Sequence, residues 1–116
     1  MAVGDRNEAR LNDASAVSTQ LGTTTTVVCT VPSGYQYVVK QVIMCNTDTQ
    51  DRVLSLAIGS AATVANRFVS FLPIAGFDTT VLDTGLVLNA GETIQGLSDT
   101  ASKVNVTVVG WTKQIA

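Results

Sequence analysis

Short runs of Val, Ile, Leu and Thr, each closed by Gly, Pro, Asn or Asp, fill the sequence from Thr23 to Trp111. β-Branched residues suit the pleated surface of a strand, and the closing residues adopt the backbone angles that tight turns need. The runs lack the 3.6-residue apolar period of an amphipathic helix. The pattern therefore predicts an all-β chain, in which eight or nine short strands form an antiparallel β-sandwich or jelly roll.

The composition changes at about residue 22. Residues 1–22 are small and polar with mixed charges, which predicts an extended N-terminal arm that leads into an edge strand. Residues 23–116 contain the strong strand patterns, without an internal repeat or a linker, and a chain of 116 residues can bury one core but not two. We therefore expect a single sandwich domain over residues 23–116. The arm either frays, as chain ends often do, or becomes ordered against a neighbouring subunit.

One strand is expected to be apolar on both faces. It follows the turn at Pro32–Gly34 and continues to Cys45. A strand of this kind lies either at the centre of a sandwich with a covered outer face or at a subunit interface. Period-2 alternation divides its residues into one face with Tyr37, Val39, Ile43 and Cys45 and another with Val38, Lys40, Val42 and Met44.

Charge is sparse, since Asp, Glu, Lys and Arg make up 14% of the sequence, against roughly a quarter in ordinary globular domains. A surface with so little charge favours packing against copies of the chain or against other partners. The net charge of −2 offers no basic field for phosphates, so we expect no direct contact with nucleic acid. The sequence shows neither the apolar core of a signal peptide nor the roughly 18 apolar residues that span a bilayer, so we also expect no membrane partner.

The sequence contains no histidine, which is the commonest general base and metal ligand. Ser-His-Asp, Cys-His and most zinc arrangements cannot be assembled without it, so we predict no catalytic, cofactor-binding or metal-binding residue. Asp78 and Asp83 could form a carboxylate pair, but their alternation points them to different faces. The turn around Asp48 and Asp51 offers oxygen ligands without the number and spacing of a calcium loop.

Two cysteines, Cys29 and Cys45, lie inside apolar strand patterns, where a thiol behaves as a small hydrophobe. We expect buried free thiols, with a disulfide or redox role as the alternative. The segment from Asn105 to Thr107 matches an N-glycosylation acceptor, which has no meaning without secretion. Its simpler interpretation is the polar side of the last strand.

Three aromatic residues, Tyr35, Tyr37 and Trp111, could stack on a sugar or a peptide. The plainer expectation is that Tyr37 alternates with core residues. Trp111 follows Gly110 at the end of the last strand, where a wide ring with one polar edge seals the rim of a sandwich.

Four landmarks between about residues 27 and 111 give the chain a resemblance to a known group of proteins. They are the turn Thr30–Gly34, the strand segment Val39–Asn46, the corner Leu86–Ile94 and the closing strand Val104–Gly110. This series resembles small β-sandwich virion proteins of tailed bacteriophages, in which a TVP-G turn enters a long strand ending at CN and an LVL-AGE-I corner precedes a Val-alternating strand. Each landmark is also ordinary β-sandwich sequence, so the resemblance rests on their order and spacing.

The resemblance implies a non-enzymatic structural protein of the virion, made in the host cytoplasm. The first expectation is a capsid decoration protein that stabilises the head lattice as a homo-oligomer, with a trimer favoured and the major capsid protein as a partner. The alternative is a tail, collar or fibre module, structural or recognising host glycans with Tyr35 and Trp111. A cupin-like enzyme on the same sandwich is a third hypothesis, which the missing histidines oppose.

Overall fold

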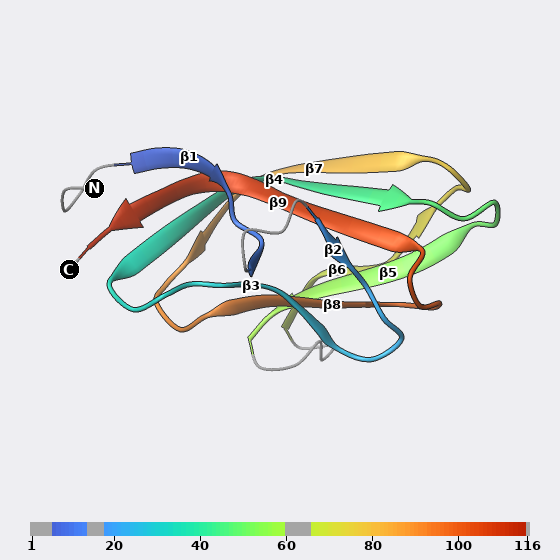
Figure 1. Cartoon of the computed structure of the whole chain (residues 1–116), viewed down its shortest axis with the longest axis horizontal. Helices are drawn as coiled ribbons and strands as arrows, with labels where there is room; N and C mark the ends of the chain where they lie inside the picture. The colour runs from blue at the N-terminus through green and yellow to red at the C-terminus, as the bar shows by residue number, and fades with distance from the viewer. Residues whose placement is uncertain (1–5, 14–17, 60–65, 116) are drawn as a thin grey trace.

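The computed structural model describes residues 6–13, 18–59 and 66–115, and it contains nine strands and no α-helix within them (Figure 1). The strands are β1 (Arg6–Arg10), β2 (Thr19–Gln20), β3 (Thr26–Thr30), β4 (Tyr35–Asn46), β5 (Arg52–Ile58), β6 (Arg67–Ile74), β7 (Thr79–Leu88), β8 (Thr93–Ser98) and β9 (Val104–Gln114).

The strands form two antiparallel sheets packed against each other (Figure 1). The first sheet has the order β1-β9-β4-β7, with β2 also paired to β9, and the second has the order β3-β8-β5-β6. The predicted all-β antiparallel sandwich is therefore confirmed. No helix within the described residues has the length and apolar character needed to cross a membrane.

The pairing pattern is that of one long hairpin rolled upon itself. From the tip outward, β5 pairs with β6, β4 with β7, β3 with β8 and β2 with β9. Rolling this ribbon brings β4 against β9 and β5 against β8, which creates the two sheets. This connectivity is the jelly-roll topology, an antiparallel arrangement built from two Greek keys.

Two of the turns predicted from the sequence are formed, each with a glycine in a left-handed conformation. At the end of β3, Gly34 has a φ of 82°, and the amide of Tyr35 donates to the carbonyl of Pro32 at 3.2 Å. At the corner between β7 and β8, Gly91 has a φ of 86°, and the side chain of Glu92 accepts a hydrogen bond from the amide of Asn89 at 2.6 Å. Both backbone angles favour glycine, which has no Cβ to clash.

The core between the sheets is aliphatic. Each large apolar side chain that becomes fully buried contributes about 2 kcal/mol through the hydrophobic effect. The alternation predicted for the last strand is confirmed, since Val104, Val106 and Val108 are all buried. The other large, fully buried side chains are Leu21, Val28, Val31, Val39, Val42, Met44, Leu54, Leu56, Ile74, Leu88 and Ile94.

A β-bulge at Lys40 interrupts the alternation of β4. Val39 pairs with Gly110 and Gln41 pairs with Val109, so Lys40 has no residue opposite it on β9. The extra residue reverses the parity of every position that follows.

The prediction that Tyr37, Val39, Ile43 and Cys45 share one face is therefore wrong. Val39 lies before the bulge and is buried in the core, whereas after the bulge it is Val42 and Met44 that are buried. Ile43 and Cys45 are half-buried on the outer side. Part of the apparent apolarity of both faces is this reversal of one core-facing stripe.

The described parts of the predicted arm lie within the first sheet. β1 pairs with one end of β9 and β2 with the other, and Leu11 and Leu21 are buried. Between them, the buried side chain of Asn12 donates to the carbonyl of Val106 at 2.9 Å and accepts from the amide of Val108 at 2.9 Å. The edge strand expected after the arm is thus present, whereas residues 1–5 and 14–17 lie outside the described residues.

Gly110 should be essential for the pairing at the bulge, because a Cβ placed there would lie 2.0 Å from the carbonyl oxygen of Val38. We expect Gly110→Ala to lower the free energy of unfolding by about 2–3 kcal/mol through this overpacking. Gly85→Ala is the matched control, since a Cβ at Gly85 meets nothing within 4 Å. Urea denaturation measures both, and equal stabilities of the two variants would contradict the prediction.

Candidate interaction surface

The outer face of the first sheet carries apolar side chains in two cross-strand rows. Register places Trp111, Val38 and Val87 side by side in one row, and Ile43 beside Val81 in the other. About half of the residue surface is exposed at Val81 (49%) and at Val87 (51%). We call these five residues the outer apolar surface. Neighbouring apolar side chains exposed in this way are typical of protein contact sites.

Charged residues surround the bulge on the same face. A shallow depression of ≈ 620 Å³ is lined by residues that include Glu8, Arg10, Lys40 and Asp83. The side-chain Nε2 of Gln41 donates to a carboxylate oxygen of Asp83 at 3.0 Å. Two acidic and two basic side chains give this depression no excess of either sign, which suits a polar protein surface better than a phosphate group.

The side chain of Lys40 partly covers the ring of Trp111. The ammonium of Lys40 lies 4.8 Å from the centre of the ring, a cation–π contact. Tyr35 and Tyr37 instead pack against the core cluster. Since Trp111 pairs with Val38 on the outer face, Tyr35 and Trp111 lie on opposite faces of the sheet and cannot form one stacking platform.

The structure does not bring Asp78 and Asp83 together. Asp78 lies just before β7, where its carboxylate accepts the amide of Thr79 at 2.8 Å. Asp83 lies in the middle of β7 on the outer face, so the two residues are separated by about 16 Å of extended chain. Paired carboxylates in glycosidases lie about 5–9.5 Å apart.

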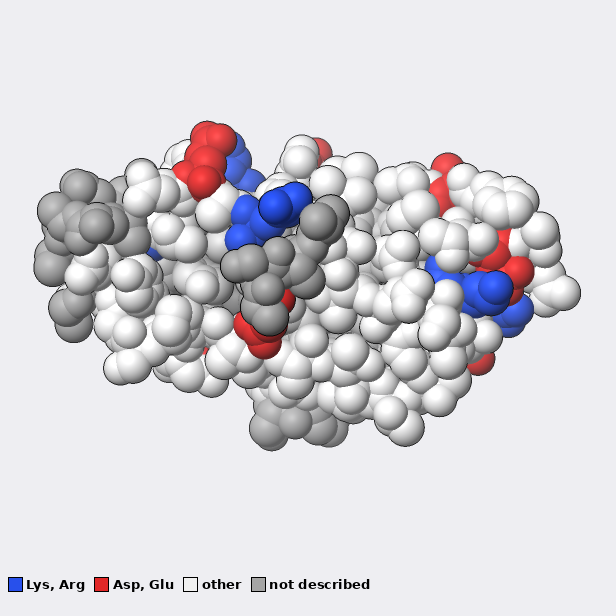
Figure 2. All heavy atoms as spheres, viewed as in Figure 1, with Lys and Arg blue, Asp and Glu red and all other residues white. Residues whose placement is uncertain are grey.

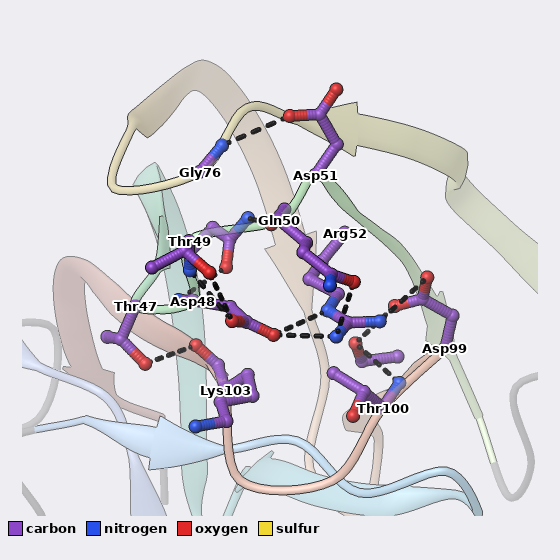
Figure 3. Close-up of polar contacts among 12 residues, drawn as sticks. Thr47, Asp48, Thr49, Gln50, Asp51, Arg52, Gly76, Asp99, Thr100 and Lys103 are labelled. Carbon is purple, nitrogen blue, oxygen red and sulfur yellow. Dashed lines mark hydrogen bonds and ion pairs between the residues drawn. The ribbon is translucent and has the colours of Figure 1, made fainter.

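Asp48 is engaged by an arginine at one end of the sandwich (Figure 3). One carboxylate oxygen of Asp48 accepts from Nε and Nη2 of Arg52, at 2.8 and 2.6 Å. Asp99 lies 3.9 Å from the same guanidinium. The hydrogen bonds from Arg52 lower the pKa of Asp48 below its ordinary value of 3.8.

Neighbouring side chains tie the turn after β4 to the turn between β6 and β7 (Figure 3). Asp51 accepts the amide of Gly76 at 3.2 Å. The buried side chain of Asn46 donates to the carbonyls of Gln50 and Ile74, both at 2.9 Å. In the described part of the chain, no three Cys, Asp or Glu residues are grouped as a metal site would require. Asp48 and Asp51 therefore have structural roles here.

Sequence reasoning missed Asn46 and Arg52 as organisers of this end. The signal available was an asparagine that directly follows an apolar strand and opens a polar turn, because asparagine side chains readily bond nearby backbone. Arg52 gave no signal of its own. Asp48 lies close to Arg52 in the sequence, as an i,i+4 pair, but Asp99 is distant, and only the folded chain brings both carboxylates to one guanidinium.

Both cysteines are free, as expected, but only one is fully buried. Cys29 lies in the core, and burial raises the pKa of its thiol to about 11. Cys45 is half-buried because the bulge at Lys40 turns it to the outer face, which corrects the expectation of two buried thiols. Asn105 and Thr107 lie on the outer side of β9, beside Cys45 and Ile43, in agreement with a polar strand face.

Charged side chains are unevenly spread over the face shown in Figure 2, which is viewed as in Figure 1. They gather in a few groups, one of them at the right-hand end, and uncharged atoms cover most of the area between. The uncharged area includes polar as well as apolar side chains, and its exposed apolar parts are the ones suited to contact with protein.

The ion pair of Asp48 should contribute to stability only while this carboxylate is charged. Its pKa is lowered in the folded state, so the contribution is present above the ordinary pKa of 3.8 and is lost as the pH falls through the lower folded-state value. We expect Asp48→Asn to have a lower urea midpoint than the wild type at pH 7 and the two midpoints to converge in acid. Arg52→Gln should behave in the same way. A constant difference at every pH would contradict the assignment.

No protein-family model and no curated protein matches this sequence. Among solved structures, the chain is similar to two crystal structures of a pentameric capsid protein isolated from metagenomic phage sequences. The first is 24% identical, with 86% of this chain and 60% of that chain covered and a TM-score of 0.35. The second is 22% identical, with 86% and 62% covered and a TM-score of 0.36. The chain thus spans about three fifths of the length of these proteins, and scores of this size transfer neither fold nor function.

Proposed function

We propose that this chain is a non-enzymatic structural protein of a bacteriophage virion, and specifically a capsid decoration protein that stabilises the head lattice. The observation that carries the proposal is the outer apolar surface of the first sheet. Val81 and Val87 leave apolar area half exposed on a regular sheet, where a partner surface can cover it. The sequence landmarks from Thr30 to Gly110 supply the phage context.

The fold is compatible with this role by analogy. Jelly rolls serve as viral capsid domains, as lectins and as cupins, so the topology alone does not choose among them. The sequence contains no histidine, so a cupin-like enzyme would lack its usual metal ligands. A glycan platform of Tyr35 and Trp111 is disfavoured because the two residues lie on opposite faces of the sheet and because the ammonium of Lys40 lies over the Trp111 ring. A capsid-associated role needs neither a metal site nor an aromatic platform.

The chemistry of the surface suits repeated, specific packing. Val and Ile have few rotamers to lose, so ordering them at an interface costs little side-chain entropy. The depression beside the bulge contains Glu8, Arg10, Lys40 and Asp83, and its balanced charges can pair with a polar protein rim. We propose that the apolar rows bind the capsid lattice, that these charges fix the orientation, and that the protein acts as a homotrimer with the major capsid protein as its partner.

We propose that the N-terminal segment contacts a neighbour through side chains of β1, and not as a free arm. Deleting residues 1–20 would remove β1 and the buried Leu11, so that deletion cannot separate particle binding from folding. Charged side chains on β1, such as Glu8 and Arg10, can reach a neighbour while the strand stays in its sheet. Both side chains are exposed.

Binding to phage particles tests the proposal. We expect Val87→Asp to reduce co-sedimentation of the purified protein with undecorated particles at least about tenfold, because it places a charge in the outer apolar surface. Val27→Asp is the control, since Val27 is exposed to a similar extent (44%) but lies on β3 of the second sheet. Circular dichroism confirms that both variants fold. Absence of wild-type binding, or equal binding by both variants, would contradict the proposal.

A further inference from the structure

One flank of the sandwich leaves two sheet edges next to each other. β6 ends the second sheet and β7 ends the first, and the two strands follow each other in the chain. A groove of ≈ 280 Å³ runs along this flank, with Phe68 and Leu72 on one side and Val81 and Leu82 on the other. We call it the β6–β7 groove. Its lining contains no charged residue.

An exposed aromatic ring stands beside this groove. Phe71 lies between two residues that line the groove and has 65% of its surface exposed. Its φ is 50°, a left-handed conformation that is unusual for a bulky residue. The pairing of β5 with β6 shifts register here, from Leu54 opposite Leu72 to Leu56 opposite Val69.

Two contacts hold Phe71 in this unusual conformation. Its amide donates to the hydroxyl of the buried Ser55 at 3.0 Å. The guanidinium of Arg67 lies 4.8 Å from the centre of its ring. Bulges and strained residues of this kind redirect side chains, and the contacts among the described residues leave 65% of Phe71 exposed.

We propose that the β6–β7 groove is the contact between copies of this chain, with Phe71 of one copy inserted into the groove of the next. The same flank carries the exposed ring of Phe71 and the uncharged β6–β7 groove, so a second, identical chain provides both complementary surfaces. The proposal rests on the proposed function only for the expectation that the protein is a homo-oligomer.

Charge favours a second copy as the occupant. The whole chain carries a net charge of −2, so most approaches between copies are repulsive. Strands β6 and β7 together contain one cation and one anion, Arg67 and Asp83. Two copies that meet on this flank therefore bring no net charge together. The contact also covers two sheet edges that would otherwise invite uncontrolled strand pairing.

Sedimentation velocity over a dilution series of the purified full chain tests the proposal. We expect the wild type to form an oligomer, and Phe71→Asp to raise its dissociation constant about 30-fold or more, as for loss of an aromatic hot spot. Aspartate tolerates left-handed backbone, so this variant should fold.

Phe77→Asp is the matched control. Phe77 is also a phenylalanine with left-handed backbone (φ 59°) and a highly exposed ring (72%), but it lies in the turn after β6 and does not line the groove. It should leave the oligomer unchanged. A monomeric wild type, or equal effects of Phe71→Asp and Phe77→Asp, would overturn the proposal. An oligomer sensitive to Phe71→Asp that is absent from phage particles would instead leave this contact standing and refute the virion function.

Discussion

The close backbone contact between β4 and β9 at Gly110 determines how the two sheets of this sandwich are built. β9 pairs with β4 along nearly its whole length, and this pairing closes the rolled hairpin into a sandwich. At the bulge around Lys40 the two backbones come close together, and only glycine fits at position 110, opposite Val39, because a Cβ there would meet the carbonyl oxygen of Val38. The bulge then decides which side chains of β4 enter the core and which remain on the outer face.

This arrangement separates structural chemistry from surface chemistry. Polar groups that become buried bond to backbone, as Asn12 and Asn46 do, and among the described residues no buried side-chain nitrogen or oxygen lacks a partner. Many of the charged groups form the network at the Asp48 end, where they tie three turns (Figure 3). The exposed valines of the outer apolar surface and the uncharged lining of the β6–β7 groove are thereby available for protein contacts.

Local patterns predicted much of the fold, and long-range register explains what they missed. Runs of β-branched residues and turns such as Pro32–Gly34 identified the strands and the sandwich, because strand period and turn chemistry are local. The bulge at Lys40 could not be predicted, since it depends on Gly110, which lies far along the chain. For the same reason the exposed Phe71 and the separation of Tyr35 from Trp111 became visible only in three dimensions. The two apolar faces predicted for β4 arose in part from the bulge, which moves one core-facing stripe from one parity to the other.

Immunogold labelling of intact phage particles, with antibody raised against this chain, tests whether the protein decorates the phage head. We expect gold distributed over the head at many sites per particle, as for a protein that decorates the capsid lattice. Gold confined to the tail, collar or fibres would contradict a decoration protein. Particles without any gold would contradict a virion role altogether.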